Sequence, residues 1–118
     1  MNVNPKPLLL ACACLLGGCA VLSSKEAIVF CQAADTATTL HAVDLGAREM
    51  NPFVNWLLTN YGSTAFIAAK IAVTLLVVKA YPDLSSDLVA VLNGVTCAVA
   101  ANNARIAGEL EKSRQVSE

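Results

Sequence analysis

The chain has 118 residues, of which 56% are hydrophobic and 14% charged, with a formal net charge of −1 and a mean hydropathy of +0.58. This length allows one domain and excludes a large two-domain enzyme. Soluble domains carry about 25% charged residues, so the composition indicates a chain that is embedded in a membrane or buried in a partner. Because there is no basic run and aromatic residues make up 5%, nucleic-acid binding is not expected.

Residues 1–18 have the features of a secretory signal. The apolar run over 8–16 is too short to span a bilayer. It ends in Leu-Gly-Gly-Cys at 16–19, which resembles the lipobox of bacterial lipoproteins. The resemblance implies cleavage before Cys19, acylation of Cys19, and a short linker over 19–25. The alternative is an uncleaved membrane anchor in which the cysteine occurs by chance.

Residues 26–46 are predicted to form the first of three long apolar helices, with Gly46 as its C-cap. The polar side chains of this segment recur on one helical face: Gln32, Asp35 and Thr39. Thr38 flanks this stripe. The single histidine, His41, lies off the stripe, where we expect a boundary residue rather than a ligand.

A short helix is predicted over 52–59, with Asn51 as its N-cap and Pro52 as its first residue. Trp56 and Tyr61 fall where a membrane–water boundary is expected. The short helix should therefore lie in the membrane interface.

The second long helix is predicted over 64–81, between the helix breakers Gly62 and Pro82. The third is predicted over 86–107, and the polar residues 108–118 are expected to fray. The third helix also carries a polar stripe with small residues around it: Asn93, Thr96 and Asn103.

Small residues allow helices to approach closely in lipid, so the polar stripes of the first and third helices should face each other. The expected fold class is all-α: a bundle of three membrane-spanning helices over 26–107 with a short interfacial helix, preceded by a signal or anchor helix. If the start of the first helix is outside, the positive-inside rule is obeyed by four residues against two. Inside are Arg48, Arg105, Lys112 and Arg114; outside are Lys25 and Lys79.

Asp35 and Lys70 lie near the middle of the first and second long helices, where an unpaired charge costs roughly 2.5–3.5 kcal/mol. We expect them to pair at similar depth, with Thr38, Thr39 and Asn93 as neutral hydrogen-bonding partners. Such a pair either fixes the register of the helices or marks an ion or proton path. The alternative for Lys70 is to extend its side chain toward the boundary.

Cys31 and Cys97 each lie in an apolar helical run, where cysteine usually acts as a small hydrophobic residue. That role is expected here, and a Cys31–Cys97 disulfide is the alternative. The sequence contains no metal-ligand spacing, no glycine-rich phosphate loop and no recognisable nucleophile–base set. We therefore expect no metal, no cofactor and no enzymatic activity.

Several of these residues form a longer pattern: Asp35 with the threonine pair 38–39, then Gly-Ala-Arg-Glu-Met-Asn-Pro over 46–52, then Lys70. The pattern resembles domain-of-unknown-function family 5658, a family of small prokaryotic membrane proteins, over about residues 27–107. The resemblance implies about three transmembrane helices and carries no established activity. It singles out Asp35, Thr38, Thr39, Glu49, Asn51, Pro52 and Lys70. Glu49 either pairs with Arg48 at the surface or fixes the loop.

The favoured function is that of a small bacterial integral membrane protein, structural or accessory, in the inner membrane. Its expected partners are membrane lipids and either further copies of itself or a larger membrane protein. One alternative is a small ion- or proton-conducting unit that uses Asp35, Thr39 and Lys70. Another is a periplasmic helical bundle that only a lipid on Cys19 anchors to a membrane.

Overall fold

The computed structural model describes residues 20–118. The predicted signal segment 1–18 and Cys19 lie outside the described residues. Within residues 20–118 the chain is all-α and contains no strand, which confirms the expected fold class at that level. After a short helical turn over 20–22, the elements are α2 (Lys25–Asp44), α3 (Pro52–Ala80), the 3₁₀ helix η1 (Tyr81–Asp83) and α4 (Ser86–Ser117).

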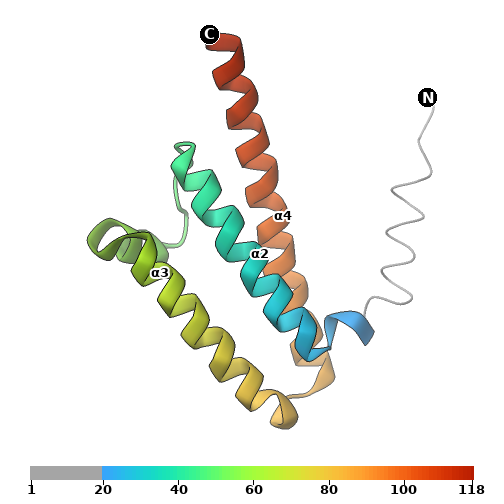
Figure 1. Cartoon of the computed structure of the whole chain (residues 1–118). Helices are drawn as coiled ribbons and strands as arrows, with labels where there is room; N and C mark the ends of the chain where they lie inside the picture. The colour runs from blue at the N-terminus through green and yellow to red at the C-terminus, as the bar shows by residue number, and fades with distance from the viewer. Residues whose placement is uncertain (1–19) are drawn as a thin grey trace, which may run out of the picture.

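The three long helices alternate in direction. α2 and α4 lie side by side and run the same way, whereas α3 runs in the opposite direction (Figure 1). α3 packs against α2 and has little contact with α4, although short connections join it to both helices. α2 and α4 are parallel because α3, which runs in the opposite direction, separates them in the sequence.

Serine caps begin two of the helices. The Ser24 hydroxyl accepts a 3.1 Å hydrogen bond from the Ala27 N–H at the start of α2. The Ser85 hydroxyl accepts one of 3.2 Å from the Leu88 N–H at the start of α4. Each cap satisfies an amide that the helix itself leaves unpaired, which is why both helices start where they do.

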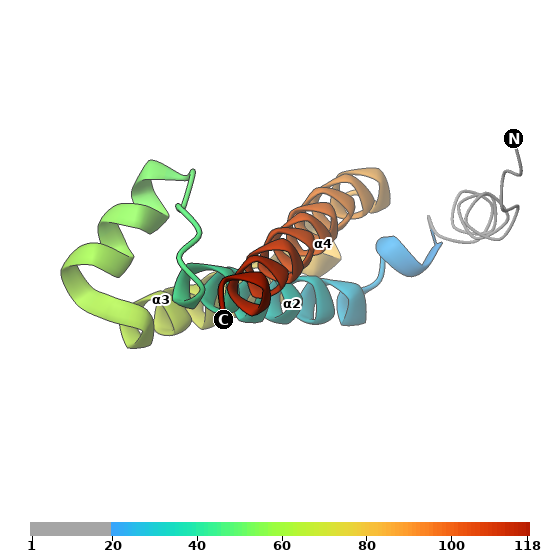
Figure 2. The ribbon, with the colours of Figure 1, turned by 90° about the horizontal axis from the view of Figure 1, so that it is seen from above.

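α3 changes direction at Gly62. This residue has φ 82° and ψ −178°, a conformation in which a side chain would be strained. Residues 52–61 consequently turn away from the rest of α3 (Figure 2). The short helix and the second long helix of the sequence analysis correspond to the two parts of α3 on either side of this kink.

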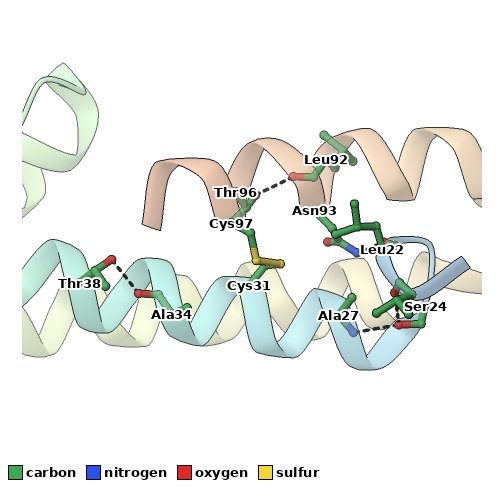
Figure 3. The surroundings of a disulfide bond; sticks show 11 residues. Leu22, Ser24, Ala27, Cys31, Ala34, Thr38, Leu92, Asn93, Thr96 and Cys97 are labelled. Carbon is green, nitrogen blue, oxygen red and sulfur yellow. Dashed lines mark hydrogen bonds between the residues drawn. A yellow bond between two sulfur atoms is a disulfide. The ribbon is translucent and has the colours of Figure 1, made fainter. Parts of the chain in front are cut away.

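The core is a seam of mostly small side chains between α2 and α4. The buried residues of this seam are Ala27, Ile28, Cys31, Ala42, Val89, Ala100 and Ala107. Because these residues are small, the two backbones approach closely, and the Cα atoms of Cys31 and Cys97 are 4.9 Å apart. The two cysteines form a disulfide (Figure 3), so the expectation that they are unpaired hydrophobic residues is wrong.

The C-terminal residues do not fray, contrary to expectation. α4 continues as a helix to Ser117. Its last turns contact the end of α2: Arg114 donates a 3.1 Å hydrogen bond to the Leu45 carbonyl, and His41 lies 2.8 Å from Glu111. These contacts give the polar tail partners that its sequence alone does not reveal.

One stretch of the described chain, Pro52–Asp83, is long and apolar enough to cross a membrane. Phe66 is the one buried residue of α3. Among residues 20–118, neither α2 nor α4 meets the same criterion of length and composition. The arrangement with three spans therefore stays a prediction.

Candidate functional site

A cavity of about 340 Å³ lies between α2, α3, α4 and the segment that joins α2 to α3. We call it the polar cavity. Its polar wall consists of Asp35, Thr39, Glu49, Asn51, Lys70 and Asn103. All of these except Asn103 were proposed as site residues from the sequence. Residues that are far apart in the chain thus meet around one space.

Lys70 is the centre of the charged part of this wall. Its Nζ donates hydrogen bonds of 2.8 Å to Asp35 Oδ2 and 2.6 Å to Gln32 Oε1. The side chains of Lys70 and Asp35 are 20% and 16% exposed. The pair forms between the two helices expected to carry it. Gln32 was not proposed as a site residue, although it lies on the same helical face as Asp35, three residues away.

Thr39 and Asn103 connect α2 to α4 at the same cavity. The Asn103 Nδ2 donates a 3.0 Å hydrogen bond to the Thr39 hydroxyl oxygen, and Thr39 is 6% exposed. Asn103 was seen in the polar stripe of the third helix but was not assigned to a site. The expected meeting of the two polar stripes takes place at this pair.

The end of α2 is formed by a glycine turn. Gly46 has φ 100°, which favours glycine. The Ala47 N–H donates to the Ala42 carbonyl and the Gly46 N–H to the Val43 carbonyl, both at 2.9 Å. This pair of bonds is the Schellman arrangement, which satisfies the last carbonyls of a helix.

The start of α3 is formed by three consecutive motif residues. The Asn51 side chain accepts hydrogen bonds from the N–H groups of Phe53 (3.0 Å) and Val54 (3.4 Å), and Pro52 occupies the first helical position. Glu49 accepts a 2.9 Å hydrogen bond from the Asn51 N–H. Of the two roles expected for Glu49, the structure shows the one that fixes the loop.

Two residues that were expected in the network with Asp35 and Lys70 lie elsewhere. The Thr38 hydroxyl donates to the Ala34 carbonyl of its own helix at 2.7 Å. Asn93 is 4% exposed, and its Nδ2 donates 2.7 Å to the Leu22 carbonyl, at the turn that precedes α2 (Figure 3). Both side chains donate to backbone carbonyls, and the periodicity of the sequence does not reveal such partners.

A second hollow, of about 600 Å³, lies between α2 and α3 and is lined mainly by aliphatic side chains. We call it the apolar groove. Lys70 borders both this groove and the polar cavity. The groove's two hydroxyls donate to backbone carbonyls at 2.7 Å, Thr36 to that of Gln32 and Thr74 to that of Lys70. The groove therefore offers an occupant little besides apolar surface.

A comparison with known proteins gives one match. The model of a family described as "Domain of unknown function (DUF5658)" matches residues 27–105, which is most of the chain. No curated protein and no solved structure matches. The matched region contains the polar cavity, the apolar groove and the disulfide.

Proposed function

The chain belongs to the DUF5658 family, and we propose that it is a three-span integral membrane protein that serves as a structural or accessory unit of the bacterial inner membrane. The observation that carries this proposal is the distribution of large apolar side chains. They are exposed on all three long helices, for example Phe30 (69%), Leu76 (66%) and Val91 (62%). A soluble bundle buries such side chains, whereas lipid covers them in a membrane protein.

Unlike the large apolar side chains, the polar side chains at the centre of the bundle are paired between helices. Lys70 bonds to Asp35, and Asn103 bonds to Thr39, so these groups are satisfied between helices. In lipid, polar side chains are costly unless they face the interior of the bundle or a water-filled cavity and find partners there. This pairing supports a membrane location for α2 and α4, although they are less apolar than α3.

The first part of α3 has the properties of an interfacial helix. Phe53, Trp56 and Tyr61 are 64%, 50% and 64% exposed. The Trp56 ring lies with its centroid 6.0 Å from that of Phe53 and 5.4 Å from that of Tyr61. Clustered, exposed aromatic rings are typical of the headgroup level of a membrane.

The disulfide and the charges suggest the same orientation. Cys31 lies near the start of α2, and disulfides form on the oxidising side of a membrane. Arg48 and Arg114 lie at the other end of α2, where positive charge marks the cytoplasmic side. We therefore place the start of α2 outside and its end inside.

The accessory role follows from the surface of α3. Apart from Phe66, its residues are not buried, and the apolar groove beside it is open. We propose that membrane lipids and either a second copy of the chain or a larger membrane protein cover this surface. Neither a metal nor a cofactor is part of the proposal.

Alkaline carbonate extraction of membranes that carry the full chain or its Cys19→Ala variant tests the membrane location. Resistance of both to extraction supports helices that cross the bilayer. Release of Cys19→Ala instead favours the lipid-anchored bundle. Because an uncleaved signal would also retain the variant, quenching of Trp56 by brominated lipids provides a second measurement. Trp56 is the single tryptophan of the chain, and a soluble bundle leaves it unquenched.

The polar cavity favours a second candidate, an ion- or proton-conducting unit in which Asp35 and Lys70 take part. Intramembrane ionisable residues beside a polar space often mark ion paths. In this case Asp35→Asn abolishes a measurable flux in vesicles while the variant still resists carbonate extraction. Loss of insertion instead favours a purely structural pair.

A further inference from the structure

We infer that the polar cavity is a hydrated vestibule, which admits water and small cations to Asp35 from the end of the bundle where α2 finishes. The apolar groove, on the other side of Lys70, stays dry. The inference rests on the proposed membrane placement, since only in lipid does the difference between the two hollows control access.

The first argument is unused hydrogen-bonding capacity on the cavity wall. Within residues 20–118, no partner is found for Asp35 Oδ1, Glu49 Oε2 or Asn103 Oδ1. In the same part of the chain, every fully buried polar side-chain atom has a hydrogen-bond partner. These unpaired oxygens are therefore not fully buried, and they border open space. A volume of about 340 Å³ corresponds to roughly ten waters at about 30 Å³ each. Water is the occupant that satisfies this wall.

The Thr39 hydroxyl adds a donor to this wall. The hydroxyls of Thr36, Thr38, Thr74 and Thr96 all donate to the carbonyl four residues earlier in their own helix. Thr39 accepts from Asn103, and among the described residues no acceptor takes its own proton. An O–H group in this position is ready to donate to a water in the cavity.

The apolar groove has one such group, the Gln32 Nε2 amide, for which no acceptor is found among residues 20–118. Its threonine hydroxyls are satisfied by the backbone, and the Gln32 carbonyl oxygen accepts from Lys70. Lys70 therefore lies between the cavity wall, which has several unpaired polar atoms, and the groove wall, which has one. An ammonium group has three N–H donors, of which Gln32 and Asp35 take two. A water on the cavity side supplies the third partner.

The charges of the cavity wall favour cations. Asp35 and Glu49 contribute two formal negative charges and Lys70 one positive charge, while α4 adds only the neutral Asn103 and Val99. A hollow with a net negative charge and low-dielectric walls concentrates cations. The wall of the cavity itself is therefore negative, while Arg48 contributes a positive charge at the adjoining hollow.

The loop that joins α2 to α3 provides the entrance. Met50, in this loop, is 83% exposed and also lines the polar cavity. A smaller hollow of about 170 Å³, bordered by Arg48 and Asn102, shares Glu49 with the cavity and continues it past the loop. The opening therefore lies at the end of the bundle that we place inside.

The test compares two new cysteines in the full-length chain, in membrane vesicles of known orientation. Val99→Cys lines the polar cavity and Ile71→Cys lines the apolar groove, and Lys70 is part of the lining of both hollows. The two native side chains are similarly exposed, Val99 to 47% and Ile71 to 56%. The probe is a cationic, membrane-impermeant methanethiosulfonate. The unsubstituted chain gives the background from its own cysteines, and carbonate resistance shows that each variant is inserted.

Val99→Cys should react about tenfold or more faster than Ile71→Cys, and only from the side of the α2–α3 loop. Slow reaction at both positions overturns the vestibule and leaves the membrane placement intact. Fast reaction at both positions, from either side, overturns the membrane placement itself. Val54→Cys is a second cavity position if Val99→Cys does not insert.

The sign of charge is tested with an anionic methanethiosulfonate. The cationic reagent should modify Val99→Cys several-fold faster than the anionic one, relative to their rates with a free thiol in solution. Glu49→Gln should reduce this preference, because glutamine retains a carbonyl oxygen for the Asn51 N–H but carries no charge. A preference that Glu49→Gln leaves unchanged overturns the cation-attracting character.

Discussion

Cys31 and Cys97 join α2 to α4 across a seam of small side chains, with their Cα atoms 4.9 Å apart. The bond connects residues 66 positions apart and encloses the whole of α3. The close approach and the bond support each other. Only small residues let the backbones come so near, and the bond keeps them there while α3 has few buried contacts of its own.

Replacement of both cysteines by alanine should destabilise the protein while the seam remains packed. For a loop of 66 residues, the chain-entropy model gives a loss of about 4 kcal/mol in the free energy of unfolding. The difference in the free energy of unfolding is measured by unfolding the purified proteins with an increasing mole fraction of a denaturing detergent. Reduced wild type is the control and should resemble the double variant. If Cys31 of the untreated protein reacts with iodoacetamide, the bond itself is absent and the prediction fails.

Lys70→Met should destabilise the protein more than the double change Asp35→Leu with Lys70→Met. Removal of one partner leaves a charge uncompensated, which costs about 3–5 kcal/mol in a buried site. The slight exposure of both side chains places this pair at the lower end of that range. A double-mutant cycle on the free energy of unfolding measures the coupling. Additive losses would show that the pair contributes nothing beyond its two separate side chains.

Gly62→Ala should straighten α3, because alanine is strained at φ 82°. A continuous helix would place Trp56 about 9 Å from residue 62 along the helix axis, at 1.5 Å for each of six residue steps, so the tryptophan would change its position. The fluorescence of Trp56 should therefore change in emission maximum and in quenching by brominated lipids. Gly108→Ala, in the regular part of α4 with open space around it, is the matched control. The same spectra for Gly62→Ala and wild type would mean that the kink persists without glycine.

Asn51→Ala should lower the free energy of unfolding by about 1 kcal/mol, because it removes the N-cap of α3. Asn51→Asp preserves the acceptor oxygen and should lose much less. Asn55→Ala is a control on the same helix, since no side-chain bond of Asn55 is found among residues 20–118. A loss for Asn55→Ala as large as that for Asn51→Ala would attribute the effect to helix composition instead of capping.

Features that depend on residues close together in the sequence could be predicted. Gly46, Asn51 and Pro52 are local stop and start signals, and the helices end and begin beside them. The all-α class follows from periodicity. The contact between Asp35 and Lys70 was also expected, because a charge in the middle of an apolar helix has few other options.

Features that depend on how the helices are aligned could not be predicted. The pairing of Cys31 with Cys97 requires knowledge of how far α4 is shifted along α2, and no spacing in the sequence states that shift. The same alignment directs Asn93 to the Leu22 carbonyl and brings Glu111 to His41. The one available signal for the disulfide was the predicted export signal over residues 1–18, since cysteines in an oxidising compartment usually pair.

The long interval between the bonded cysteines has a consequence for biosynthesis. A ribosome adds about 5–20 residues per second, so Cys31 is made roughly 3 to 13 seconds before Cys97, 66 residues later. Through this time the earlier thiol has no intramolecular partner in α4. Copies made close together should therefore yield some chains joined through Cys31, and slower elongation, which lengthens this time, should raise the fraction of chains in this covalent dimer.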